Sequence, residues 1–127
     1  MPIDVAALVD AARGAIREVD PKHLDGELDA VTLIDVREPA EFESGHLPGA
    51  VNIPRGVLEF QIHAHPAVGG ATDEALALPQ RPIVLYCRSG GRSALAAQSL
   101  QLLGLSNVRS LTGGIEAWRR LNGKAAG

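Results

Sequence analysis

The apolar and polar positions of the chain follow two different periods, which predict helices and buried strands in alternation. In residues 4–16 the apolar side chains recur at helical spacing, and Asp4 is placed to cap the first turn. We expect an amphipathic helix there that packs on a flat surface. Residues 31–36 and 82–87 are almost continuously apolar and rich in β-branched side chains, as in strands covered on both faces. Such strands indicate a parallel sheet.

The remaining elements continue this alternation. Further strands are predicted at residues 50–53 and 108–111, and further helices at 38–45, 91–104 and from 115 onward. The acidic stretch 25–29 is expected to be a solvated connection, and residues 57–62 a short helix followed by a break at Gly69-Gly70 and a capped turn at 72–74. Together the elements predict an α/β domain with a parallel sheet and helices on both faces.

Composition limits the function classes. The 127 residues suffice for one domain, and 46% of them are apolar, which is enough for a hydrophobic core. Four aromatic residues and a net charge of −3 argue against a nucleic-acid partner. The beginning of the chain lacks the pattern of a signal peptide, and no apolar run is long enough to cross a membrane. We therefore expect a cytoplasmic protein that does not contact a membrane.

Cys87 is the only cysteine, and it lies in a cationic part of an unevenly charged chain. It excludes an intrachain disulfide and any multi-cysteine zinc site. The net charge is −7 over residues 1–64 and +4 over 65–127, and no acidic residue lies between Glu74 and Glu116. Such charges can simply draw two halves together on folding, and counts alone favour that interpretation. Only the sequence around Cys87 can indicate whether these positive charges stabilise its thiolate.

The segment Cys87-Arg88-Ser89-Gly90-Gly91-Arg92, followed by Ser93, joins a predicted buried strand to a predicted helix. Ligands of open parallel sheets bind at the carboxyl ends of the strands. Two glycines let successive N–H groups converge, and the helix adds the positive end of its dipole, so the loop is predicted to hold an anion. Nearby arginines also favour the thiolate, which makes Cys87 a candidate nucleophile at neutral pH. The alternative, a small buried residue that ends a strand, does not require flanking arginines.

Four segments in register resemble the single-domain rhodanese family. They are the following: Asp35-Val36-Arg37-Glu38; Gly45-His46-Leu47-Pro48-Gly49-Ala50 with Asn52-Ile53-Pro54; Cys87 to Ser93; and Gly113-Gly114 with Trp118. The resemblance implies a three-layer α/β/α fold with a five-stranded parallel sheet. It also implies a single domain over 1–127, with a short leading strand and a helix in 1–20, a motif-bearing core at 31–122 and a frayed tail at 124–127.

The resemblance further implies a sulfurtransferase that works through a cysteine persulfide. Cys87 would accept sulfur, the N–H groups of Arg88, Ser89, Gly90, Gly91, Arg92 and Ser93 would hold it, and Arg88 would bind a small anionic donor such as thiosulfate. Cyanide or a thiol, carried by a protein or a small molecule, would be the acceptor. No metal or organic cofactor is implied.

Three further residues are predicted to support the loop. Asp35 ends the strand next to that of Cys87, and the resemblance suggests that it pairs with Arg92. Arg37 belongs to the same segment. His46 is expected to be a hydrogen-bonding loop residue, because a thiolate that is already ionised needs no general base. Trp118 is expected in the core.

Two other functions compete with sulfur transfer. A cysteine phosphatase or arsenate reductase of the related fold would also cradle an anion, but those enzymes place five residues between Cys and Arg, whereas four separate Cys87 from Arg92. A non-catalytic interaction module is the other alternative, and the intact Cys87 counts against it. Residues 55–78 could govern acceptor choice, and His63 with His65 could share a metal, although a nearby cluster of further ligands is lacking.

Overall fold

The computed structural model describes residues 2–62 and 82–122 of the chain. Within these residues five strands form one sheet in the order β1-β5-β4-β2-β3, and every neighbouring pair is parallel. The strands are β1 (Arg17–Val19), β2 (Thr32–Asp35), β3 (Val51–Asn52), β4 (Ile83–Tyr86) and β5 (Val108–Leu111). The predicted α/β class with a five-stranded parallel sheet is confirmed.

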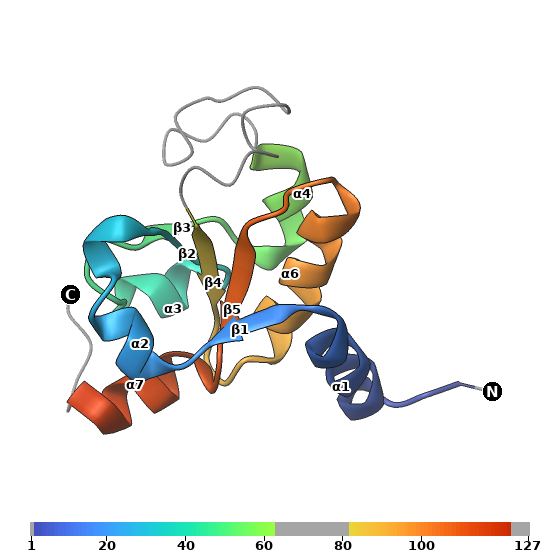
Figure 1. The fold of residues 1–127 in the computed structure, drawn as a ribbon, viewed down its shortest axis with the longest axis horizontal. Coiled ribbons are helices and arrows are strands. Elements are labelled where there is room, and N and C mark those ends of the chain that lie inside the picture. Colours follow the sequence, from blue (N-terminus) through green and yellow to red (C-terminus); the bar gives the residue numbers. More distant parts are fainter. Residues whose placement is uncertain (1, 63–81, 123–127) are drawn as a thin grey trace.

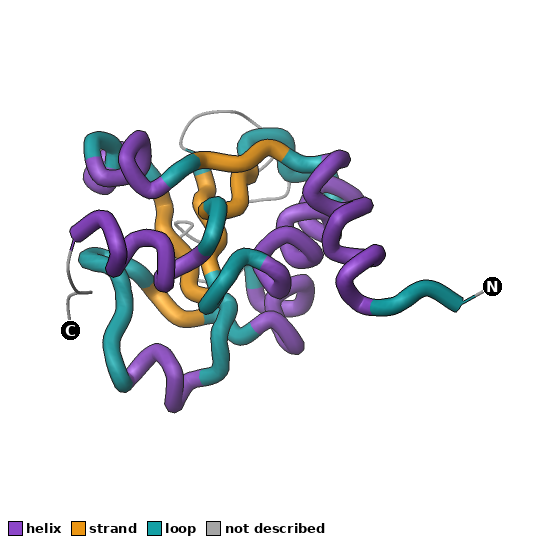
Figure 2. The backbone as a smooth tube through the Cα atoms, turned by 90° about the horizontal axis from the view of Figure 1, so that it is seen from below, coloured by secondary structure: helices purple, strands orange, loops and turns teal. Residues whose placement is uncertain are grey.

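Helices cover both faces of this sheet, as Figures 1 and 2 show. One face carries α1 (Val5–Ala15), η2 (Arg55–Val57), α4 (Leu58–Gln61) and α6 (Gly91–Leu102). The other carries α2 (Pro21–Asp25), η1 (Leu28–Ala30), α3 (Pro39–Glu43) and α7 (Gly114–Asn122). The three layers match the arrangement that the sequence predicted.

The central strand divides the hydrophobic core into two parts. All four residues of β4 are buried, and successive side chains point to opposite faces. Ile83, Leu85 and then Cys87 join the cluster beneath α4 and α6. Val84 and Tyr86 join the cluster beneath α2 and α7, which also contains Trp118, 3% exposed as expected of a core residue. Cys87 therefore ends its strand on the face that α6 covers.

The amino-terminal region differs from prediction in two ways. Helix α1 begins at Val5 with Asp4 as its N-cap, as predicted, and it packs on α6. Only Ala12 of this helix is buried, and Val5 and Leu8 stay 70% and 45% exposed. The short strand β1 follows α1 and does not lead it, and it pairs with β5 at the sheet edge. The stretch expected to be a plain connection contains the end of α2 and the short helix η1.

The predicted short helix near residues 57–62 is confirmed by η2 and α4. The glycine break, the turn at 72–74, His63, His65, most of segment 55–78 and the tail 124–127 lie outside the described residues. No helix within the described part of the chain is long and apolar enough to span a membrane.

Candidate active site

The thiol of Cys87 lies at the carboxyl end of β4, at the start of the loop that leads into α6. The residue is 1% exposed. The backbone N–H of Gly90 donates to Cys87 Sγ at 3.1 Å, and the Ser93 hydroxyl lies 3.6 Å from the same sulfur. Gly90 is the N-cap of α6 with φ of 108°, a left-handed conformation that a residue with a Cβ seldom adopts. The glycine thus turns its N–H toward the sulfur, and the helix dipole adds positive potential there.

A second hydroxyl supports Ser93. Ser110, on the neighbouring strand β5, lies 2.8 Å from Ser93 through their Oγ atoms, and neither residue is exposed. Ser93 also donates to Gly90 O at 3.3 Å. Because a buried hydroxyl needs partners, the two serines fix one another beside the thiol. The sequence analysis did not predict a role for Ser110 at the site. The signal that could have indicated one is a polar residue within an otherwise apolar, buried strand.

The turn at Gly113-Gly114 brings the first turn of α7 into contact with the loop after Cys87. The N–H groups of Ile115 and Glu116, in the first turn of α7, donate to the carbonyls of Cys87 at 2.9 Å and Arg88 at 3.1 Å. A Cβ on Gly114 would lie 2.5 Å from both carbonyl oxygens, and its φ is 61°. Only a glycine at position 114 allows α7 to approach the loop after Cys87 this closely, which explains why the sequence has a glycine there.

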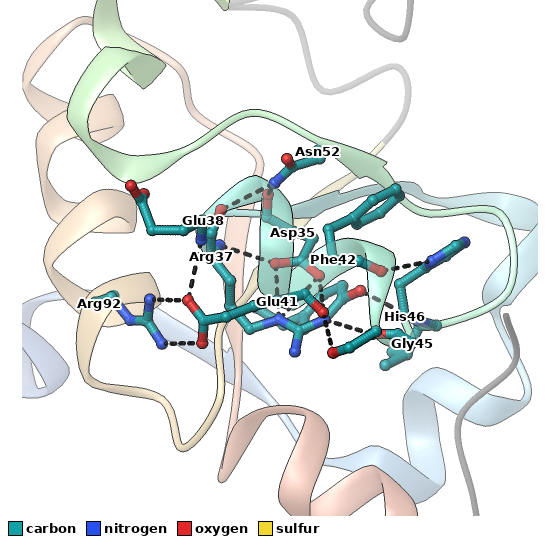
Figure 3. A network of polar contacts seen from close by, with 12 residues as sticks. Asp35, Arg37, Glu38, Glu41, Phe42, Gly45, His46, Asn52 and Arg92 are labelled. Carbon is teal, nitrogen blue, oxygen red and sulfur yellow. Dashed lines mark hydrogen bonds and ion pairs between the residues drawn. The ribbon is translucent and has the colours of Figure 1, made fainter.

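Asp35 does not pair with Arg92, and the predicted pairing is wrong. Asp35 instead receives three bonds from the Arg37 side chain, at 3.0, 3.0 and 2.7 Å, and a fourth from the Arg37 backbone N–H at 2.8 Å (Figure 3). Arg37 also donates to Gly45 O at 2.6 Å. Both side chains are almost fully buried. Arg37 folds back on the carboxylate two residues earlier and occupies it, so Arg92 must find another partner.

That partner is Glu41 of α3. The two guanidinium nitrogens of Arg92 donate to the two carboxylate oxygens at 2.8 and 3.0 Å (Figure 3). These bonds hold the pKa of Glu41 at about 2, well below its usual value. The pKa of Arg92 is raised, first by Glu41 and also by the charge of Cys87. Arg92 is therefore a charged group that α3 holds beside the thiol.

The other predicted residues lie around this centre. Arg88 is exposed, and its Nε donates to Glu116 of α7 at 3.0 Å. His46 stacks on Phe42 with ring centroids 4.0 Å apart, and its Nδ1 lies 3.2 Å from Phe42 O. This placement matches the expected hydrogen-bonding loop histidine. Within the described ranges, no group of three or more His, Cys, Asp or Glu side chains could hold a metal ion.

A family model for the rhodanese-like domain matches residues 20–121, which is most of the chain. The chain belongs to this family. A sulfurtransferase of Allochromatium vinosum is 33% identical over 108 residues, which cover 83% of this chain and 90% of that protein. The family match and this relative support a sulfurtransferase-type enzyme.

Solved structures agree on the rhodanese-like fold. The human single-domain sulfurtransferase TSTD1 has a TM-score of 0.65 and 30% identity, over 81% of this chain and 95% of that one. A protein of unknown function from Rhodopseudomonas palustris, described as a possible tyrosine phosphatase, has a TM-score of 0.76 and 34% identity, over 98% and 96% of the two chains. The second neighbour makes the phosphatase alternative worth a direct test.

Proposed function

We propose that this rhodanese-like protein transfers a sulfane sulfur through a persulfide on Cys87. The observation that carries the proposal is the bond from the Gly90 N–H to Cys87 Sγ, in a six-residue loop at the start of α6. A backbone donor and a helix N-terminus stabilise negative charge without any proton transfer, so they suit a thiolate and equally a persulfide anion.

In the first half of the reaction, the Cys87 thiolate attacks the outer sulfur of a donor such as thiosulfate. A sulfur–sulfur bond forms to Cys87 while the donor's own sulfur–sulfur bond breaks, and its electron pair leaves with sulfite. In the second half, cyanide or a thiol attacks the terminal sulfur and restores the Cys87 thiolate. The loop N–H groups hold the sulfur, Ser93 lies beside it, and Asp35, Arg37 and His46 shape the neighbouring segment.

Intact-protein mass spectrometry tests the proposal. Incubation with thiosulfate, or with an organic persulfide, should add about 32 Da, the mass of one sulfur atom, and added cyanide should remove it. Cys87→Ser should take up no sulfur and keep its fold, because serine preserves the size of the buried side chain. If neither donor adds mass to the wild type, or if the serine variant is still modified, Cys87 is not the carrier.

Phosphatase activity is the second candidate, since one structural neighbour is described as a possible tyrosine phosphatase. Four residues between Cys87 and Arg92 leave a loop too tight to surround the oxygens of a phosphate. In addition, Glu41 places a carboxylate on Arg92, where a phosphate would need a free guanidinium. We expect no hydrolysis of p-nitrophenyl phosphate above the Cys87→Ser control.

A non-catalytic interaction module is the third candidate. A module that only docks a partner would leave the thiol unmodified by either sulfur donor, so the same mass measurement separates it from an enzyme. The cytoplasmic location expected for a protein with a single reduced cysteine remains part of the proposal.

A further inference from the structure

Ser110 is a polar residue on an otherwise apolar face of the sheet. Val108, two residues earlier on β5, belongs to the hydrophobic cluster beneath α4 and α6, and side chains two apart on a strand point to the same face. Ser110 pairs with Leu85 of β4, which belongs to the same cluster. The residue is fully buried, and burying a hydroxyl costs free energy that an apolar side chain would not. A hydroxyl in this position is therefore expected to serve the adjacent site.

The hydroxyl of Ser93 connects Ser110 to the thiol. It lies 2.8 Å from Ser110 Oγ, 3.3 Å from Gly90 O and 3.6 Å from Cys87 Sγ. A hydroxyl has one proton to donate and two lone pairs that accept. Ser93 can therefore donate to only one of these three atoms at a time.

The thiol form of Cys87 fixes the direction of these bonds. The S–H group donates to Ser93 Oγ, and Ser93 donates its own proton to Gly90 O. The proton between the two serines must then come from Ser110, which uses the second lone pair of Ser93.

Ionisation changes what the sulfur needs from Ser93. The proton leaves to solvent, the electron pair of the S–H bond stays on the sulfur, and the thiolate only accepts hydrogen bonds. Ser93 can stabilise it by turning its O–H from Gly90 O to Cys87 Sγ. Gly90 O keeps a partner, because the backbone N–H of Ala94 donates to it at 3.1 Å. Ser110 donates to Ser93 in both states.

We propose that Ser110 is a positioning residue: by donating to Ser93, it leaves the Ser93 proton free to turn to Cys87 Sγ when the thiol ionises. The inference rests on the proposed function, since it concerns the thiolate that would attack the sulfur donor. Ser110 acts through Ser93, and its hydroxyl favours the ionised form of Cys87 without carrying a charge.

The elements packed around Cys87 also carry charged groups. These are Arg92 with Glu41 of α3, Arg88 with Glu116 of α7, Asp35 with Arg37 at the end of β2, Arg55 with Glu59 of α4, Arg119 and Arg120 of α7, and Asp10, Arg13 and Glu18, which line a cavity between α1 and the loop. Replacement of the uncharged Ser110 leaves every one of these charges in place. A change in the ionisation of Cys87 in such a variant therefore reports the hydroxyl.

The ultraviolet absorbance of the thiolate, followed against pH on the full-length chain, tests the proposal. Cys87→Ser supplies the blank, and Tyr86, the single tyrosine, does not interfere because burial raises its pKa above the usual range. Ser110→Ala should move the midpoint of the titration upward by about 0.7 pH unit, a fivefold weaker ionisation, which is the typical effect of one hydrogen bond. Ser110→Thr keeps the hydroxyl and should stay close to the wild type.

A second background shows whether Ser110 acts through Ser93. In Ser93→Ala, the further change Ser110→Ala should leave the midpoint where it is, because the intermediate hydroxyl is already absent. Thr112→Val is the matched control. It removes a hydroxyl directly after β5 that donates to Glu18 at 3.4 Å, and it should not move the midpoint.

The proposal is overturned if Ser110→Ala leaves the midpoint unchanged, or if it shifts the midpoint equally with and without the Ser93 hydroxyl. Alanine removes one oxygen atom from apolar surroundings, so the variant should fold, and Ser110→Thr provides an independent measurement. The titration needs no sulfur donor. Failure of both donors to load Cys87 would refute the proposed function, whereas the titration still decides the role of Ser110.

Discussion

At the scale of single residues, the pair of Asp35 and Arg37 is the most buried ion pair of the described part of the site. Four hydrogen bonds join the two residues, and their side chains are 0% and 4% exposed. Removing one member of such a pair leaves the other charge buried without its counter-ion, which costs far more than the pair contributes. The pair therefore locks the segment that leads into α3 and thus positions Glu41.

We predict that Asp35→Asn lowers the free energy of unfolding by about 3 kcal/mol, because Arg37 stays charged in the interior. Urea denaturation measures the change. Glu59→Gln is the control, since its pair with Arg55 is similarly short at 2.8 Å but 30% exposed on both sides, and it should cost less than about 1 kcal/mol. Equal losses in the two variants would contradict the role assigned to burial.

The pair of Glu41 and Arg92 should make stability depend on acid. The pKa of Glu41 is about 2 in the folded chain and 4.5 ordinarily. A carboxylate whose pKa is lower in the folded chain than in the unfolded chain stabilises the fold at any pH above the unfolded pKa. That contribution is lost as pH falls from about 5 toward 2. Both side chains are about one-third exposed, so solvent screening reduces the contribution to about 1 kcal/mol.

Glu41→Gln should accordingly be less stable than the wild type by about 1 kcal/mol at pH 7, and the difference should shrink as pH falls below about 5 and vanish below about pH 2. Unfolding titrations over this range measure it. A difference that stays constant with pH would show that the variant acts through packing and not through the charge of Glu41.

At the scale of elements, the contact that supports the site is that of α7 with the loop after Cys87. The first turn of α7 donates two N–H groups to the loop carbonyls, and Gly114 leaves no space for a side chain at that point. The loop is therefore held by β4 at one end, by α6 at the other and by α7 beneath. This support explains how a loop with two glycines can keep a defined shape.

Gly114→Ala should lower the free energy of unfolding by about 3 kcal/mol or more and abolish sulfur loading, because its Cβ would meet backbone and not a flexible side chain. Gly104→Ala is the control that measures backbone strain alone, without a steric clash. Gly104 also has a positive φ, 94°, but nothing lies within 4 Å of its Cβ position, so strain of about 1 kcal/mol is expected there. Similar effects in both variants would mean that strain, and not the close approach, governs Gly114.

At the scale of the whole molecule, stability should decrease from the centre of the sheet outward. Strand β4 has a partner on each side and four buried residues, whereas α1 contributes one buried residue and rests on α6. Elements with few buried apolar contacts open without unfolding the rest. The thiol lies at the end of this central, fully buried strand, while α1 lies at the periphery.

We predict that amide hydrogens of β4 exchange only on global unfolding, and that those of α1 exchange at least about 100-fold faster. Nuclear magnetic resonance exchange measurements resolve the two elements. Asp4→Ala, which removes the N-cap bond to Ala7, should accelerate α1 further and leave β4 unchanged. Exchange of α1 at the rate of β4 would mean that the helix is an integral part of the core.

The sequence by itself determined the fold class and the place of the thiol. Both can be predicted from residues that are close together in the chain. The spacing of apolar residues predicts strands and helices, and Cys87 directly follows the strand with the clearest pattern. The N-cap at Asp4 and the burial of Trp118 follow from the same local chemistry. Exposed strand β1 escaped this reasoning, because three residues with two of them exposed carry almost no periodic signal.

Only the tertiary structure decided which side chains meet at the site. Glu41 and Arg92 are 51 residues apart, and Ser93 and Ser110 are 17 apart. The order of the strands brings Asp35 and the Cys87 loop to one edge, but the orientation of α3 and the fold-back of Arg37 determine the partners. A charged side chain binds whichever opposite charge packing brings within about 3 Å, and that distance is a property of the assembled layers.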